Sequence, residues 1–194
     1  ILSSSDLVYR SLVLNCVART ARHLDKSADK AAQGLPRLVA WGGIVAASML
    51  LPGGAARKLF GEAGLKRAID GAFYADGGTI SRSPLAQLEG VMLLTMVRAV
   101  YDARREAAPD FLGEALARVV PALQGLAHGD GGLGSWQGAG AIDPGRVSAI
   151  VNASRVRARP LRQARDWGYQ RLTAGTTVLQ VDADPAKDMA RRAA

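Results

Sequence analysis

Apolar residues recur at helical spacing through most of the chain. In residues 6–26, apolar side chains at positions 7, 8, 12, 13, 16 and 17 form one stripe, and Asp6 is suited to cap the helix N-terminus. Residues 36–51 are apolar on nearly all sides, begin with a proline and end at a Pro-Gly-Gly turn. The pattern predicts an amphipathic first helix with Cys16 in the core, and a buried second helix that is too short to span a membrane.

Further helices are predicted in the same way. They cover residues 55–74, 84–105, 110–127 and 144–153. The stripe expected to be buried in residues 55–74 consists of Leu59, Phe60, Leu65, Ile69 and Phe73. After Trp167 the pattern changes, and residues 173–182 alternate in the way that is typical of strands. Short or moderate loops between the helices indicate successive antiparallel helical hairpins.

Composition agrees with a mainly helical globular protein. Aromatic residues make up 5% of the chain, and β-branched residues are scarce before the last quarter. A single cysteine excludes a disulfide framework. There is no initial methionine, no visible signal peptide and no partner for the late strands, so we expect the chain to be a piece of a longer protein.

The net charge of +8 and the pI of about 10.2 indicate a polyanionic partner. Much of this charge is concentrated at Arg155, Arg157, Arg159, Arg162 and Arg165. Two interpretations of this segment stay open, a solvated linker or a surface that binds polyanions. With few aromatic residues and no recognisable nucleic-acid module, we expect no nucleic-acid partner.

Three glycine-containing stretches follow one another along the chain. They are Asp-Gly-Gly-Thr-Ile-Ser-Arg-Ser-Pro at 76–84, His-Gly-Asp-Gly-Gly-Leu at 128–133, and Gly-Tyr-Gln-Arg-Leu at 168–172, which continues into Gly-Thr-Thr-Val at 175–178. In order and spacing they resemble the toroid-to-sandwich region of heparinase II/III-like proteins, a family of bacterial polysaccharide lyases. The resemblance covers nearly the whole chain.

This resemblance implies a mainly α fold. Residues 1–160 would form an incomplete (α/α) toroid of antiparallel helical hairpins, and residues 161–194 a linker with the first strands of a C-terminal antiparallel β-sandwich. It also implies β-elimination of a uronic-acid polysaccharide such as a glycosaminoglycan, in the periplasm or cell envelope. That chemistry needs a base, an acid and a group that neutralises the uronate, and no metal or other cofactor.

The candidate site residues come from the three stretches and their neighbours. His128 and Tyr169 are the candidate catalytic residues. The candidate substrate-binding residues are Arg82, Ser83, Gln87, Asp130, Trp136 and Arg171. Structural roles stay open beside these: His128 as a helix C-cap, Trp136 as a loop anchor, Arg82 as a loop stabiliser, and Tyr169 and Arg171 as packing residues.

The chain also departs from the family pattern. Ala86 stands where the catalytic tyrosine is expected, and Lys30 and Ala31 stand where an Asn-His pair is expected. The alternative function is therefore a non-catalytic protein that binds carbohydrate or another polyanion on the same scaffold.

Overall fold

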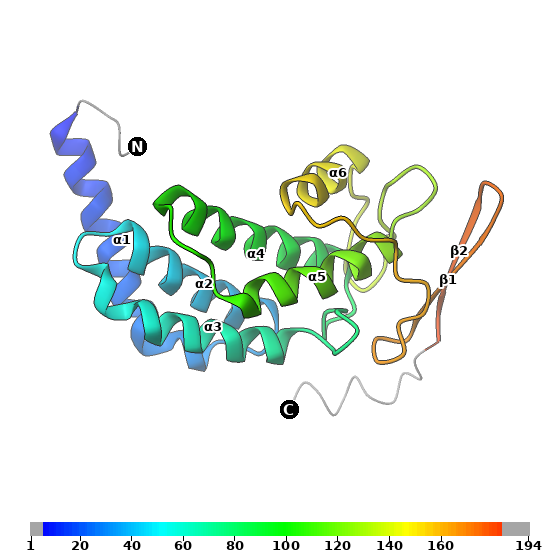
Figure 1. Cartoon of the computed structure of the whole chain (residues 1–194), viewed down its shortest axis with the longest axis horizontal. Coiled ribbons are helices and arrows are strands. Elements are labelled where there is room, and N and C mark those ends of the chain that lie inside the picture. Colours follow the sequence, from blue (N-terminus) through cyan, green and yellow to red (C-terminus); the bar gives the residue numbers. More distant parts are fainter. Residues whose placement is uncertain (1–5, 184–194) are drawn as a thin grey trace. The chain divides into compact units, whose positions relative to one another are not determined.

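The computed structural model describes residues 6–183, which form helices followed by one β-hairpin (Figure 1). The elements in chain order are α1 (Leu7–Ser27), η1 (Ala28–Lys30), α2 (Leu35–Leu50), η2 (Gly54–Arg57), α3 (Lys58–Ala72), α4 (Pro84–Arg104), α5 (Asp110–Gly125), α6 (Pro144–Ala153), β1 (Tyr169–Ala174) and β2 (Thr177–Asp182). These bounds confirm the predicted helices to within a few residues.

Side-chain caps fix where two of the helices begin. The Asp6 carboxylate accepts a hydrogen bond from the Tyr9 backbone N–H at 3.0 Å, which confirms the predicted cap of α1. Asp143 caps α6 in the same way by accepting from the Arg146 N–H at 2.9 Å, and Pro144 occupies the first turn. Each cap satisfies one of the N–H groups that the first turn of a helix leaves free.

The chain divides into two compact units, and the division falls inside α4 and inside α5. The first unit contains residues up to 72 and residues 92–114. Its core is centred on α2, which is buried as predicted. The Trp41 ring packs edge-on against Phe60, with 4.9 Å between ring centroids, and lies directly against Gly64. Within residues 6–183, no helix combines the length and apolar character that a membrane crossing requires.

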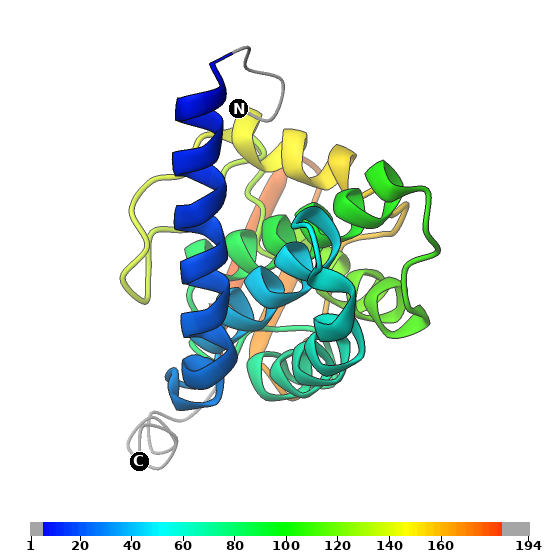
Figure 2. The ribbon, with the colours of Figure 1, turned by 90° about the vertical axis from the view of Figure 1, so that its left-hand side faces the viewer.

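The apolar stripe of α1 is mostly exposed. Leu7 is 75% exposed, Leu12 is 65% exposed, and Cys16 is exposed, so the prediction of a core cysteine is wrong. Ala21 is the residue of α1 that is buried, and the first turns of the helix extend away from α2 and α3 (Figures 1 and 2). In α3 the predicted stripe is only partly buried, because Leu59 is 80% exposed. Periodicity shows which face is apolar but not whether another element covers it.

The second unit contains residues 73–91 and the residues from 115 onward, including the β-hairpin. β1 and β2 pair antiparallel, with Tyr169 opposite Asp182 and Ala174 opposite Thr177. This register leaves a two-residue turn, whose first residue, Gly175, has a φ of 56°. A positive φ at this position is typical of the tight turns that match the twist of a hairpin.

The predicted fold class is wrong. In residues 6–183 the helices form two compact units and the only sheet has two strands, so neither an (α/α) toroid nor a β-sandwich is observed. The helices themselves were predicted correctly, but their assembly was taken from the family resemblance. The backbone groups of β1 and β2 that face each other form hydrogen bonds within the hairpin. Backbone groups of residues 162 and 164 form hydrogen bonds with the outer edge of β1. The predicted domain boundary between residues 160 and 161 stays a prediction.

Candidate functional site

The loop that joins α3 to α4 is held by the carboxylate of Asp76. One oxygen accepts from the Gly78 N–H at 3.2 Å, which turns the loop, and the other accepts from the N–H groups of Asp166 and Trp167 at 2.9 Å each. The Trp167 ring packs on Gly78 so closely that a Cβ there would lie 2.0 Å from it. The Asp-Gly-Gly sequence thus both turns the chain and docks a segment about ninety residues away.

Gln87 fixes the same loop from the first turns of α4. Its side chain is 0% exposed, and its carbonyl oxygen accepts from the Thr79 N–H at 2.7 Å. Its amide nitrogen donates to the carbonyl oxygens of Gly77 and Val119, both at 2.9 Å. Ser83 is nearly buried, and its carbonyl oxygen accepts from the Gln87 N–H as α4 begins. Gln87 and Ser83 therefore form hydrogen bonds with backbone groups of this loop and of the helices beside it.

Arg82 is buried and has the left-handed backbone conformation, with a φ of 57°. Its Nε donates to the carbonyl oxygen of Trp167 at 3.1 Å, and its terminal nitrogen pairs with the Asp182 carboxylate. The guanidinium also lies 4.9 Å from the centroid of the Tyr169 ring, a favourable cation–π distance. Arg82 thus joins the loop before α4 to the open end of the hairpin, where Tyr169 and Asp182 lie opposite each other.

Aromatic rings from three parts of the second unit form one cluster. Tyr169 packs edge-on against Trp167 at 4.9 Å between centroids and at a tilt against Trp136 at 5.8 Å. His128 approaches Trp136 edge-on at 6.1 Å. Tyr169 donates its hydroxyl to the carbonyl oxygen of Arg82 at 3.0 Å. Within residues 6–183, the indole N–H groups of both tryptophans are buried without a hydrogen-bond partner, so ring packing holds these side chains.

The loop after α5 presents His128 and Asp130. The backbone closes tightly, because the His128 N–H donates to the Gly132 carbonyl oxygen at 2.8 Å and the Gly131 N–H donates to the His128 carbonyl oxygen at 3.1 Å. The Asp130 carboxylate accepts from the Gly132 N–H at 2.8 Å. His128 is half-buried and Asp130 is exposed, so these two side chains remain accessible to other molecules.

Arg171 crosses from β1 to the end of α5. Its guanidinium donates to the carbonyl oxygens of Gly125 and Ala127, and desolvation by burial lowers the pKa of Arg171. The Gln180 amide also donates to the Gly125 carbonyl oxygen, at 3.5 Å. These bonds complement the carbonyl groups that the last turn of a helix leaves free.

The structure therefore brings most of the predicted site residues into one unit. Arg82, Tyr169, Trp136 and His128 form a connected cluster, while Gln87, Ser83 and Arg171 bond to the adjoining backbone. Their proposed action on a substrate stays a prediction. Asp76 and Trp167 were missed, although the Asp-Gly-Gly turn was a signal for the first. Within residues 6–183, no group of three or more His, Cys, Asp or Glu side chains is arranged to hold a metal ion.

Comparison with known proteins shows similarity to a curated protein over most of the chain. The chain is 29% identical over 185 residues, which is 94% of its length, to FtsZ-localized protein C of Caulobacter vibrioides. It spans 31% of the length of that relative. No family model matches the chain, and no solved structure matches it.

These findings correct the identification as a heparinase II/III-like lyase. No family model supports it, and the curated relative has a different name. The predicted β-elimination, the alternative of a non-catalytic carbohydrate- or polyanion-binding protein on the lyase scaffold, and the acidic polysaccharide partner are wrong for the same reason. The predicted periplasmic or envelope location is also wrong, since the relative is named for localization with FtsZ. The error arose because short glycine-containing turns recur in unrelated proteins.

Proposed function

We propose that this chain is part of a cell-division protein that associates with FtsZ. The observation that carries the proposal is the similarity to FtsZ-localized protein C, which extends over 94% of the chain. Because the matched region is 31% of the relative, the proposal concerns association by this part and leaves other activities to the rest of such a protein.

The geometry of the second unit supports a scaffold for association. The polar ends of Arg82, Gln87 and Tyr169 bond to backbone or side chains of their own unit. Groups used in this way rigidify a surface, because breaking their bonds would leave buried polar atoms unsatisfied. A rigid surface with exposed charge is suited to docking a partner protein.

Co-sedimentation tests the proposal directly. Purified FtsZ is polymerised with GTP, mixed with the 194-residue chain and centrifuged, with FtsZ held in GDP as the unpolymerised control. We expect the chain to pellet in proportion to the FtsZ polymer. A basic protein of similar pI, such as lysozyme, controls for attraction by charge alone, which matters because the pI of the chain is about 10.2. If the chain stays in the supernatant, or pellets no more than lysozyme, the proposal is wrong.

A further inference from the structure

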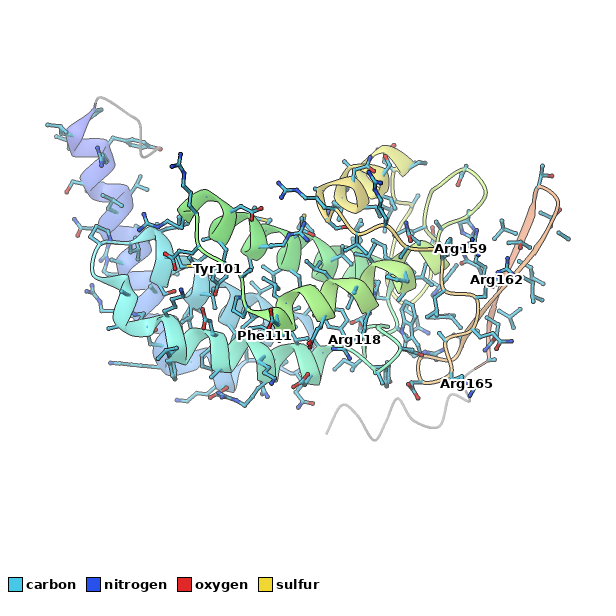
Figure 3. The ribbon with its side chains drawn as sticks, in the orientation of Figure 1. Tyr101, Phe111, Arg118, Arg159, Arg162 and Arg165 are labelled. Atoms are coloured by element: carbon cyan, nitrogen blue, oxygen red, sulfur yellow. The ribbon has the colours of Figure 1, made fainter. Side chains whose placement is uncertain are left out.

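A strip of arginines runs along the segment that joins α6 to the hairpin. Arg157, Arg159, Arg162 and Arg165, called here the arginine strip, are all exposed, and no acidic residue lies between positions 155 and 165. None of the four belongs to an ion pair within residues 6–183. Figure 3 shows three of them, Arg159, Arg162 and Arg165, following this segment past β1 and β2.

The segment is fixed to the second unit by backbone hydrogen bonds. The Leu161 N–H donates to the carbonyl oxygen of Pro121 at 2.9 Å. The Arg171 N–H donates to the Arg162 carbonyl oxygen at 2.8 Å, and the Ala164 N–H donates to the Tyr169 carbonyl oxygen at 2.9 Å. The backbone around Arg162 and Arg165 is therefore held by the fold, which is not the behaviour of a solvated linker.

These bonds also show which edge of β1 is open. In an antiparallel pair, successive residues alternate between bonding to the partner strand and pointing to the outer edge. Tyr169 and Arg171 use their outer groups on residues 164 and 162. Thr173 is next on the same edge, opposite Val178, and within residues 6–183 its outward N–H and carbonyl groups have no partner. The segment thus covers the outer edge of β1 at Tyr169 and Arg171 and leaves the edge open at Thr173.

An open groove lies at this point. Leu161, Arg162 and Gln163 line one side, and Arg171, Leu172 and Thr173 line the other. The groove thus combines one exposed charge of the arginine strip, apolar surface from two leucines, and the free backbone groups of a strand edge.

We infer that this groove binds an extended acidic peptide segment of a partner protein, which pairs as a strand with the edge of β1 at Thr173 and places its carboxylates on the arginine strip. The inference rests on the proposed function for the identity of the partner as a division protein. Strand addition gives affinity through backbone bonds, and alternate side chains give specificity. A lipid headgroup neutralises arginines equally well but has no backbone to pair with Thr173, so the open edge favours a peptide.

Two variants test separately whether binding depends on the charge of the arginine strip and on the open edge of β1. Replacing Arg159, Arg162 and Arg165 together by glutamine removes charge from exposed side chains. Thr173→Pro removes the outward N–H and leaves the bonds between β1 and β2 intact. Val178→Pro is the matched control, because Val178 is the cross-strand partner of Thr173 and its N–H points to the opposite edge of the hairpin. Far-UV circular dichroism of each variant checks that the chain is folded.

The binding assay is fluorescence anisotropy of a labelled eight-residue peptide of alternating glutamate and valine, titrated with the full chain. We expect the triple arginine variant to bind about tenfold more weakly. We expect Thr173→Pro to weaken binding and Val178→Pro to leave it unchanged. A peptide of alternating glutamate and proline has the same charge but cannot pair along the edge, so it should bind more weakly than the glutamate–valine peptide. Raising the salt concentration should weaken every complex.

Other outcomes overturn the inference. Equal binding of the two acidic peptides, together with an unaffected Thr173→Pro variant, would mean that charge alone is recognised. Binding to phosphatidylglycerol vesicles without binding to the glutamate–valine peptide would replace the peptide by a membrane surface. The FtsZ assay distinguishes the two proposals: FtsZ pelleting of the native chain without binding of the glutamate–valine peptide refutes the groove but keeps the proposed function. Peptide binding without FtsZ pelleting does the reverse.

Discussion

Gln87 was predicted to bind substrate, yet its side chain is fully buried and bonded on all sides to the backbone. Replacing it by methionine tests which role it has. Methionine has a similar volume, so the substitution removes hydrogen bonds without opening a large cavity. It leaves the Thr79 N–H and the carbonyl oxygens of Gly77 and Val119 without the partners that they have in the native chain.

The expected cost follows from these three bonds. Each buried backbone group that loses its partner costs about 1–3 kcal/mol. With the lower figure for each group, Gln87→Met should reduce the free energy of unfolding by about 3 kcal/mol. In a domain of this size, about 1 kcal/mol corresponds to a shift in Tm of about 2–4 °C, so we expect Tm to fall by roughly 6–12 °C.

Urea unfolding followed by tryptophan fluorescence measures this effect, because two of the three tryptophans, Trp136 and Trp167, lie in the second unit. Trp167 lies in the second unit, is 1% exposed and packs on the loop that Gln87 holds. Gln33→Met is the matched control, because the same chemical change is made on an exposed side chain. We expect the control to unfold within about 0.5 kcal/mol of the native chain.

A Gln87→Met variant as stable as the Gln33→Met control would refute this reasoning. It would mean that water or a shifted backbone satisfies the freed groups at little cost. The substrate-binding prediction for Gln87 would then deserve a test of its own.

Two further predictions concern the first unit. Tyr101→Phe removes a hydroxyl that donates to Glu62 at 2.7 Å and should cost about 1 kcal/mol in urea unfolding. Burial and Glu62 raise the pKa of Tyr101 above that of the unfolded chain, which is about 10. The loss of stability in Tyr101→Phe should therefore be complete below about pH 10 and become smaller above it. A loss of stability that does not depend on pH would contradict this role of the hydroxyl. Gly64→Ala places a Cβ 2.0 Å from the Trp41 ring and should cost about 1–3 kcal/mol. A Cβ added at Gly113 would have no atom within 4 Å, so Gly113→Ala should stabilise α5 by about 0.5–1 kcal/mol. Calorimetry should therefore show a lower Tm for Gly64→Ala and a higher Tm for Gly113→Ala. Shifts of Tm with the same sign in both variants would contradict the packing argument.

The helices could be predicted from the sequence because their signals are local. Asp6, Pro84 and Asp143 each act within the first turn of the helix that they begin. What covers each helix is not a local property, and for this reason the exposure of Leu12 and Leu59 was not anticipated. The toroid was an inference from resemblance, and no periodicity in the chain could have corrected it.

The candidate site was predicted in part. The sequence pointed to Arg82, His128 and Tyr169, which the structure places in one connected cluster. It did not show that the polar ends of Arg82 and Tyr169 bond within their own unit, because the bonding partners lie 85 or more positions away along the chain. Asp76 was missed for the same reason, since its carboxylate reaches Trp167 across 91 positions.

These long-range bonds have a consequence for the order of folding. α2 and α3 are neighbours in sequence and can pack as soon as both are synthesised, whereas the loop held by Asp76 has to wait for Trp167. Contacts of such sequence separation form slowly, because a long stretch of chain must be closed first. The segment with the arginine strip is anchored on β1, so it too takes its final position late. During synthesis on the ribosome, the strip therefore reaches this arrangement only after the hairpin has emerged.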